Sequence, residues 1–458
     1  METLLNTATD TIVAIATPPG RGGIGVIRVS GPESAALAKK VLGKTPEPRK
    51  VHYGPFSDKQ GNLLDEGIAL YFKKPSSFTG EDVLELQGHG GPIVLDMILQ
   101  QLVQMGCRMA RPGEFSERAF LNDKINLTQA EAVADLIDSS TQQAARSALN
   151  SLKGTFSTLI DELIEQLVDL RCYLEAAIDF PDEDIELLAE DKISPRIIEI
   201  QTQLTAILQQ AKQGALIKEG IQVVIMGKPN AGKSSLLNCL AGSSRAIVTD
   251  IEGTTRDILE EQINIDGLPI NFIDTAGLRE PKDQVEKEGI RRALQRLESA
   301  DCVLLLEDGT KKGQAEIDSK YKDQLPDSIP IIRLINKIDL TEAVPGLANS
   351  DENQPYPVLY ISAKQNLGIE QLKTYLKEVV GFNNTSESNF TARRRHLECL
   401  FETAQILEAA LEQWKAAGAA ELLAEDMRAA QKSLETITGS FSNEDLLDVV
   451  FSGFCIGK

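Results

Sequence analysis

The segment Gly227-Lys-Pro-Asn-Ala-Gly-Lys233-Ser234 has the GxxxxGKS spacing of a phosphate-binding loop. It follows an apolar run at 221–226 that predicts a strand and precedes residues 235–240, which predict a helix. Glycines there allow backbone N–H groups to surround phosphate oxygens, while the lysine reaches the β- and γ-phosphates and the serine hydroxyl holds Mg²⁺. The loop therefore predicts a site for a nucleoside triphosphate with Mg²⁺.

Three further motifs follow in an order that favours guanine over adenine. Asp274-Thr-Ala-Gly277 ends a predicted strand, so Asp274 is expected near Mg²⁺ and the Gly277 N–H near the γ-phosphate. Asn336-Lys-Ile-Asp339 supplies a carboxylate that accepts hydrogen bonds from guanine N1–H and N2–H₂, which adenine does not offer. Ser362-Ala-Lys364 suits the guanine O6 edge. The set predicts GTP and resembles the GTPases of the Ras-like superfamily.

Leu278 follows the second motif where Ras-like proteins carry the glutamine that orients the attacking water. Leucine cannot hydrogen-bond water, so another group has to orient it. Thr255 is the expected second Mg²⁺ hydroxyl. Asn230 offers an oxygen that a K⁺ ion accepts, although the residues alone favour a hydrogen bond that stabilises the loop. The residues expected to contact GTP are Asn230, Ala231, Gly232, Lys233, Ser234, Ser235, Thr249, Asp250, Ile251, Glu252, Gly253, Thr254, Thr255, Asp274, Thr275, Ala276, Gly277, Asn336, Lys337, Asp339, Ser362, Ala363 and Lys364.

The chain ends Phe-Cys-Ile-Gly-Lys458, with Cys455 in fourth place from the end. That is the spacing of a prenylation motif, but Gly457 is not aliphatic, Lys458 is atypical there, and no basic run precedes them. Two roles for Cys455 stay open. It packs within a Phe-rich tail, or it acts as a nucleophile or acid/base in a site to which the tail folds back.

The composition is that of a globular protein, with 25% charged and 42% hydrophobic residues among 458. No run is long enough for a transmembrane helix, and the N-terminus lacks a signal-peptide pattern. Six cysteines without CxxC pairs favour reduced thiols in a cytoplasmic protein, and three scattered histidines argue against a His/Cys metal site. The net charge of −21 argues against non-specific coating of nucleic acid. If RNA is a substrate, it would be bound at a local basic patch or with the help of a partner.

The residue patterns predict a multidomain protein with α/β and all-α parts. Residues 1–120 predict an α+β domain, 121–215 the first part of a helical domain, 216–380 a Ras-like GTPase domain, and 381–458 the second helical part with the tail. Two one-sided helical blocks around an α/β block favour one helical domain with an insertion. Two small separate helical domains are the alternative.

Two local features underlie the helical prediction. Thr128-Gln-Ala-Glu131 has the capping-box pattern and predicts a helix start. An apolar stripe with spacings of three and four predicts one long helix through Leu149, Leu152, Phe156, Leu159, Leu163, Leu167, Leu170 and Leu174. A second stripe predicts a partner helix through Leu397, Leu400, Ala404, Leu407, Leu411 and Trp414.

Two glycine-rich segments in the N-terminal part resemble other motifs without their context. Residues 20–25 match GxGxxG, but a strand follows instead of a helix, so a tight turn is expected. The segment Gly88-His89-Gly-Gly91 is similar to an esterase oxyanion loop, but no GxSxG nucleophile motif exists, so His89 is expected to be structural. By themselves Arg28, Glu85 and Lys124 indicate only surface charges.

Over essentially the whole chain, the sequence resembles the tRNA-modification GTPases called MnmE or TrmE. The resemblance is carried by long segments: ATPPGRGG (Ala16–Gly23), FTGEDVLELQGHGGP (Phe78–Pro92), RPGEFSERAFLNDK (Arg111–Lys124), GKPNAGKSSLLN, TDIEGTTRD, DTAGLRE, ARRRH (Ala392–His396) and the terminal FCIGK.

The resemblance implies an N-terminal domain that binds folate and forms a homodimer, and a helical domain split by the GTPase domain. It implies 5-formyltetrahydrofolate, or another one-carbon tetrahydrofolate, in contact with Arg28, Glu85, Lys124 and Lys458. It implies K⁺ ligands at Asn230, Thr249, Ile251 and Thr254, Mg²⁺ ligands at Ser234 and Thr255, and Glu286 as the group that orients water. Cys455 is then a candidate catalytic residue near the folate.

The family's activity requires a flavoprotein partner, MnmG, which carries FAD and forms a heterotetramer with it. Together they add an aminomethyl or carboxymethylaminomethyl group to C5 of the wobble uridine of certain tRNAs, and K⁺-stimulated pairing of the G domains drives the cycle. One alternative is a regulatory or ribosome-associated GTPase switch without folate chemistry. Another is a folate-dependent aminomethyltransferase without GTP turnover.

Overall fold

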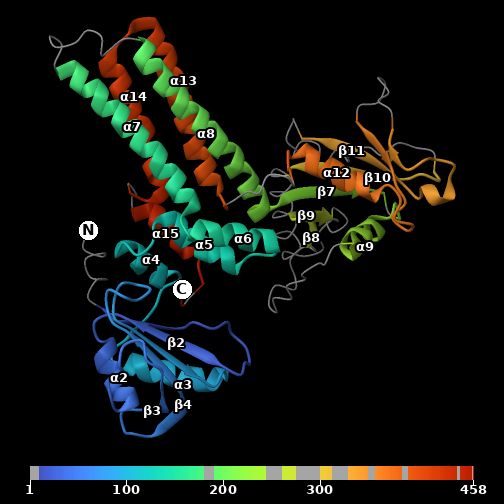
Figure 1. Ribbon diagram of the computed structural model, residues 1–458. Coiled ribbons are helices and arrows are strands. Elements are labelled where there is room, and N and C mark those ends of the chain that lie inside the picture. The colour runs from blue at the N-terminus through green and yellow to red at the C-terminus, as the bar shows by residue number, and fades with distance from the viewer. Residues whose placement is uncertain are drawn as a thin grey trace, which may run out of the picture. The chain divides into compact units, whose positions relative to one another are not determined.

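A computed structural model of the chain (Figure 1) describes residues 10–179, 190–228, 230–243, 260–274, 300–311, 329–348, 356–383, 390–440, 444–455 and 457. Across these ranges, none of the helices combines the length and apolar composition that crossing a bilayer requires. The chain divides into two compact units, one of residues 1–134, 151–201 and 402–458, the other of residues 135–150 and 202–401. The four domain ranges predicted above stay predictions.

The first unit begins with a six-stranded sheet in the order β3-β4-β5-β2-β1-β6. Its strands pair antiparallel except β1 with β6, which are parallel. They are β1 (Ile12–Ile15), β2 (Gly25–Ser30), β3 (His52–Ser57), β4 (Leu63–Phe72), β5 (Val83–Gly88) and β6 (Arg108–Met109). Helices α2 (Ser34–Leu42) and α3 (Pro92–Gln104) bury their apolar residues in one core with Ile27, Leu84 and Leu86 of the sheet.

Two long helices, α7 (Thr155–Asp179) and α14 (Ala420–Thr438), lie side by side in the first unit (Figure 1). Apolar residues at helical spacing are fully buried on both, from Phe156 to Leu174 on α7 and from Leu423 to Ile437 on α14. The other helices described outside residues 221–383 are α4 (Glu114–Leu121), α5 (Leu127–Ile137), α6 (Gln142–Leu152), α8 (Glu190–Glu219), α13 (Arg394–Ala417) and α15 (Glu444–Ser452).

Two predictions about the first helical stretch are wrong in detail. The capping box lies two residues earlier than predicted: the Asn126 side chain accepts from the Gln129 N–H at 2.9 Å, and the Gln129 side chain accepts from the Asn126 N–H at 3.0 Å. The stripe from Leu149 to Leu174 is not one helix, because the chain turns between α6 and α7 at Gly154, where φ is +92°. Leu149 is 41% exposed, and Ile160 takes the core position expected of Leu159.

The second unit contains a seven-stranded sheet in the order β12-β13-β11-β10-β7-β9-β8. Its five middle strands are parallel and the two edge strands antiparallel. The strands are β7 (Ile221–Gly227), β8 (Glu260–Ile265), β9 (Leu268–Asp274), β10 (Cys302–Asp308), β11 (Ile331–Asn336), β12 (Gly346–Leu347) and β13 (Val358–Tyr360).

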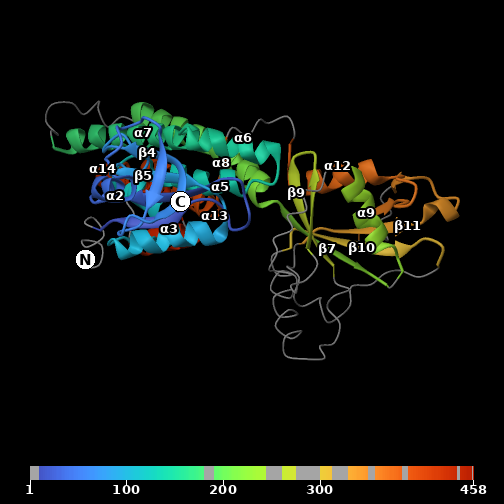
Figure 2. The same cartoon turned by 90° about the horizontal axis from the view of Figure 1, so that it is seen from below.

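One face of this sheet is covered by α9 (Lys233–Ser243) and α12 (Ile369–Val379), and Figure 2 shows β7, β10 and β11 at its centre. Alternate residues of β7, Val223 and Ile225, join a single core with Leu236 of α9 and Leu372 of α12. Val224 is equally buried but points to the other face. Strands buried on both faces are typical of parallel α/β sheets, which bring their functional loops to the carboxyl edge.

The ends of this α/β part meet at one buried carboxylate. Asp135 of α5 pairs with Lys218, which precedes β7, at 3.2 Å and with Arg393, which precedes α13, at 2.7 Å. The Thr391 hydroxyl also donates to it. Arg393, first of the basic run 393–395, is thereby part of an internal ion pair, while Arg394 is exposed and pairs with Glu398.

Candidate functional site

The phosphate-binding loop connects β7 to α9 at the carboxyl edge of the seven-stranded sheet. Asn230 and Gly232 both have positive φ, +66° and +106°. A Cβ on Gly232 would overlap the Asn336 side-chain nitrogen, so the loop has no room for a larger residue. A loop of this kind, directly before the N-terminus of a helix, is typical of sites where backbone N–H groups bind phosphate.

Asn336 joins the loop to the base-binding segments. Its side-chain amide donates to the Ala231 carbonyl at 2.9 Å, and its side-chain oxygen accepts from the Ala363 N–H at 3.0 Å. The side chain is buried, and both its amide nitrogen and its oxygen take part in these bonds. It therefore fixes the two loops that would hold the phosphates and the base relative to each other.

Asp339 and Ser362, predicted to bind guanine, are in direct contact. The Ser362 hydroxyl donates to Asp339 Oδ1 at 2.6 Å. Asp339 lies in the 3₁₀ turn η4 (Ile338–Leu340) directly after β11, and Ser362 follows β13. One carboxylate oxygen is oriented by the serine, which leaves Asp339 Oδ2 and the second lone pair of Oδ1 for a ligand.

Lys337 connects the base segment to the phosphate loop from the other side. Its ammonium group donates to the Asn230 carbonyl at 2.8 Å and pairs with Asp308 Oδ2 at 2.7 Å. The hydrogen bond from Lys337, with one from Thr310, lowers the pKa of Asp308 to about 2. The pair holds the end of β10 against the loop in its charged form.

The lowered pKa of Asp308 predicts a pH-dependent contribution to stability. The contribution is complete above the ordinary pKa of 3.8 and disappears as the pH falls toward about 2, because protonation of Asp308 removes its attraction to Lys337. In Asp308→Asn that contribution is absent at every pH. We therefore expect the difference in urea midpoint between the wild type and Asp308→Asn to shrink from pH 5 to pH 2.5. A constant difference over that range would contradict the assignment.

Several predicted contacts lie outside the described residues. They are Thr249, Asp250, Ile251, Glu252, Gly253, Thr254, Thr255, Thr275, Ala276, Gly277, Glu286 and Lys458, and only the backbone of Asp274 is described. The described candidates from Asn230 to Ser235, with Asn336, Lys337, Asp339 and Ser362 to Lys364, all lie at the carboxyl edge of the sheet. In the described ranges, no group of His, Cys, Asp and Glu side chains forms a metal cluster.

The first unit brings Arg28 and Glu85 together on neighbouring strands. They are cross-strand partners on β2 and β5, and the guanidinium pairs with the Glu85 carboxylate at 2.9 Å. Phe78 and Phe115 lie 5.9 and 5.7 Å from the guanidinium carbon, close enough for cation–π contacts. The pair is partly exposed and thus open to a ligand.

The C-terminal tail folds back onto this pair. Gly457 is buried against Ile15, with φ at +97°, and its carbonyl accepts from Arg28 at 3.4 Å. Phe451 and Phe454 are buried beside Leu127 of α5, and the Gly113 N–H donates to the Cys455 carbonyl at 3.4 Å.

Cys455 itself is exposed, so the phenylalanines supply the packing of the tail and the thiol does not. By contrast, burial raises the pKa of Cys107 and of Cys302 to about 12, which makes both thiols unreactive at neutral pH. A catalytic role for Cys455 stays a prediction.

Lys124 lies at the edge of the same region. Its ammonium group donates to the Pro75 carbonyl at 3.0 Å, in the loop that carries Phe78 toward Arg28. The predicted turn at residues 20–25 is confirmed, and its Gly22 N–H donates to the Gly90 carbonyl. His89 is 73% exposed and its ring pairs with Asp65 at 2.7 Å.

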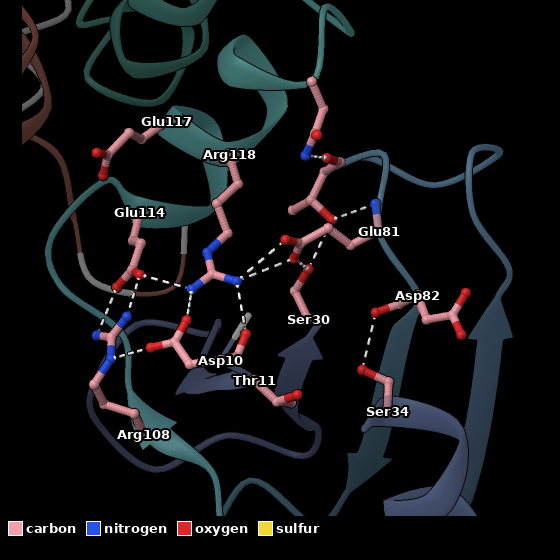
Figure 3. A network of polar contacts seen from close by, with 12 residues as sticks. Asp10, Thr11, Ser30, Ser34, Glu81, Asp82, Arg108, Glu114, Glu117 and Arg118 are labelled. Carbon is pink, nitrogen blue, oxygen red and sulfur yellow. Dashed lines mark hydrogen bonds and ion pairs between the residues drawn. The ribbon is translucent and has the colours of Figure 1, made fainter. Parts of the chain in front are cut away.

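A buried ion network supports this region, and the sequence reasoning missed it (Figure 3). Arg118 of α4, 5% exposed, pairs with Asp10 at 2.5 Å, Glu114 at 3.0 Å and Glu81 at 3.2 Å. Burial would raise the pKa of Glu114, but bonds from Arg108, the Arg111 N–H and Arg118 outweigh it and the pKa lies below its ordinary value. The spacing of Glu114 and Arg118 in the segment 111–124 is the only hint in the sequence.

Comparison with known proteins decides the family. A model described as "MnmE helical domain" matches residues 127–455, more than half of the chain, and one described as "GTP-binding protein TrmE N-terminus" matches residues 11–124. This chain belongs to the MnmE family. The recognised family and the predicted fold class are confirmed: the two models give an N-terminal domain and a helical domain, and the parallel sheet with its loop between β7 and α9 gives the P-loop GTPase fold.

MnmE relatives match the chain from end to end. The "tRNA modification GTPase MnmE" of Proteus mirabilis is 54% identical over 455 residues, covering 98% of this chain and 100% of that protein. The protein of the same name from Saccharophagus degradans is 54% identical over 452 residues, covering 98% and 99%. A crystal structure of an Aquifex aeolicus Era variant bound to GDP and AlF₄⁻ covers 40% of this chain and 66% of its own at 26% identity, with a TM-score of 0.24, too low to carry an argument.

Proposed function

We propose that this chain is the GTP-hydrolysing subunit of a complex that modifies C5 of the wobble uridine of certain tRNAs, with a one-carbon tetrahydrofolate as donor. The observation that carries the GTPase part is the contact of three loops at one sheet edge, where Asn336 bonds to both the phosphate loop and the Ala363 N–H. Its MnmE relatives bear the name tRNA modification GTPase, which supports the tRNA substrate.

The residues of the site fit GTP with Mg²⁺. The positive-φ loop offers N–H groups to phosphate oxygens, and Lys233 lies at the start of α9, where its charge offsets that of the β- and γ-phosphates. The Ser234 hydroxyl, with Thr255, would hold Mg²⁺, which supplies charge neutralisation between the phosphates when bound. Asp339, held by Ser362, accepts the two guanine donors.

K⁺ would occupy a place beside the phosphates, held by Asn230, Thr249, Ile251 and Thr254. The place of Asn230 supports this, because the residue is exposed within the phosphate loop and its side chain carries the type of oxygen that K⁺ accepts. A monovalent cation at this place would offset the negative charge of the transition state, as an arginine finger does. Glu286 would orient the attacking water.

Nucleotide preference and cation dependence test the GTPase part. We expect the full-length chain to hydrolyse GTP at least about 100-fold better than ATP, because only guanine offers two donors to Asp339. In KCl the turnover should exceed that in NaCl severalfold. Equal turnover of GTP and ATP would refute the base assignment, and equal rates in the two salts would refute the K⁺ site.

A folate would bind at the Arg28–Glu85 pair. The 2-amino-4-oxo edge of a pterin presents two adjacent N–H donors, which a carboxylate such as Glu85 accepts. Arg28, paired with Glu85, would lie beside the pterin, while Lys124 suits the carboxylates of the glutamate tail. The fold-back of the tail supports the participation of Gly457, Lys458 and Cys455, because Gly457 already contacts Arg28.

Removal of the tail tests the folate part. We expect 5-formyltetrahydrofolate to bind the intact chain and to bind a chain ending at Ser452 at least about tenfold more weakly by calorimetry. Gly113→Ala, which puts a Cβ 2.6 Å from the Phe451 carbonyl, should weaken binding in the same direction by displacing the tail. Equal binding by the intact chain, the truncated chain and Gly113→Ala would show that the tail packs against the domain without contacting folate. No binding by any would favour the regulatory GTPase switch.

The proposed complex also includes a second copy of the chain and the flavoprotein MnmG, which carries FAD, in a cytoplasmic heterotetramer. Exposed apolar residues support the homodimer: Ile93 and Met97 lie one turn apart on α3, 73% and 44% exposed. Ile24, 68% exposed, lies in the turn that bonds to Gly90 just before this helix. Apolar surface of this kind is typical of an interface.

A further inference from the structure

Exposed lysines form a band on the open edge of the six-stranded sheet in the first unit. Lys39 and Lys40 end α2, Lys44 follows it, Lys50 precedes the edge strand β3, and Lys73 and Lys74 follow β4. All six are exposed. We call this set the basic band.

Contacts between the segments make the band one continuous surface. Helix α2 packs against β3, and Lys44 lies close enough to His52 on β3 that burial and its charge together lower the pKa of His52. The Arg49 N–H donates to the Tyr71 carbonyl at 2.8 Å, and its guanidinium to the Ser76 carbonyl at 3.0 Å. These bonds join residues 49–50 to the loop at 73–76.

Internal pairing does not account for these charges. Between residues 39 and 50 the sequence has five Lys or Arg and one Glu, Glu47, whose partner is Lys50. The carboxylate of Asp82 accepts from the backbone N–H of Lys74 and from the Tyr71 hydroxyl. The position of Lys39 and Lys40 is explained by the dipole of α2, because cations are favourable near the C-terminus of a helix. The positions of the other four lysines are not explained in this way. In a chain with a net charge of −21, such a concentration of cations indicates an anionic partner.

We propose that the basic band binds the phosphate backbone of the tRNA; the identity of that RNA rests on the proposed function. Tyr53 is 67% exposed on the edge strand β3 and points to the sheet face opposite His52 and α2. An RNA that crosses this edge can stack an unpaired base on it, which favours RNA over an acidic protein. The band ends at the loop where Lys124 donates to the Pro75 carbonyl and which carries Phe78 toward Arg28. RNA bound along it would therefore lead to the proposed folate site.

Equilibrium binding of a labelled, unmodified tRNA to the full-length chain tests the band. The band variant carries Lys39→Gln, Lys40→Gln, Lys44→Gln and Lys50→Gln. The matched control carries four neutralisations at exposed positions of the same unit, Lys153→Gln in the turn between α6 and α7 and Lys192→Gln, Lys415→Gln and Arg428→Gln on helices. Fluorescence anisotropy is measured between 50 and 200 mM KCl, and GTP turnover is measured for all three proteins.

We expect the band variant to bind at least about tenfold more weakly at 100 mM KCl, with the salt slope of log K reduced by about 3, while the control stays within about twofold. GTP turnover should be equal in all three. If the wild type binds and the band variant binds equally, or the control loses as much, the band is overturned and the proposed function stands.

Two other outcomes also decide whether the basic band binds tRNA. A wild type that turns over GTP but binds no tRNA at 50 mM KCl overturns the band, while wobble modification in the presence of MnmG decides the proposed function separately. If poly-glutamate displaces the labelled tRNA from the wild type as strongly as unlabelled tRNA does, and the band variant binds neither, the surface is assigned to an acidic protein instead.

Discussion

Asp339→Asn should raise the Kd for GTP at least about 100-fold and turn the site toward xanthosine triphosphate. The substitution removes two hydrogen bonds between a carboxylate and guanine, each contributing about 1.5–3 kcal/mol. The asparagine amide then faces the guanine 2-amino group with a donor of its own, whereas it can donate to the 2-oxo group of xanthine. Ser362, which orients the carboxylate at 2.6 Å, keeps the side chain in place.

Nucleotide titration with both triphosphates measures the switch in preference. Glu342→Gln, at an exposed position three residues further on, is the matched control and should leave GTP binding unchanged. If Asp339→Asn binds GTP with unchanged affinity, the base does not lie at the end of β11. The prediction of GTP over ATP would then lose its basis.

Arg118→Ala should destabilise the first unit by about 3–5 kcal/mol, the cost of leaving buried carboxylates without their counter-charge. Glu114 is 1% exposed and Asp10 and Glu81 are partly buried, so each would lose a pairing that water cannot fully replace. Arg111→Ala is the control. Its guanidinium is 46% exposed and pairs with Glu117 at 2.9 Å and with Glu114 at 3.7 Å. Because Glu114 keeps its closer arginine partners in this variant, a loss below about 1 kcal/mol is expected.

Trp414 reports this unfolding directly, because it is the only tryptophan of the chain and lies buried in the first unit. Its fluorescence in urea should show a much earlier transition for Arg118→Ala than for Arg111→Ala. Equal transitions for the two variants would show that the network of Figure 3 contributes no more than a surface pair.

The nucleotide-binding part was predictable because each motif is short and contiguous. The strand before Gly227 and those before Asn336 and Ser362 were identified by apolar runs, and the parallel sheet then brings their ends to one edge. The contact of Ser362 with Asp339 follows from that topology. The bond from Asn336 to Ala231 does not, because nothing local indicates which loop an asparagine side chain will bind.

Long-range polar contacts were beyond sequence reasoning. Arg118 and Asp10 are 108 residues apart, and Arg28 and Gly457 are 429 apart, so no periodicity connects them. The two errors about the first helical stretch have local causes. Asn126 displaced Thr128 as the cap because its side chain reaches the Gln129 N–H, and the turn at Gly154 divided a stripe whose spacing alone looked continuous.

Nucleoside mass spectrometry tests the proposed function most directly, on an unmodified tRNA incubated with this chain, MnmG, a one-carbon tetrahydrofolate, an amine donor (ammonium or glycine) and either GTP or a non-hydrolysable analogue. We expect a mass increase on the wobble uridine with GTP and little with the analogue, because cleavage of the γ-phosphate held at the phosphate-binding loop drives the cycle. An unmodified uridine with GTP, or equal modification with the analogue, would contradict the claim that GTP hydrolysis by this chain drives tRNA modification.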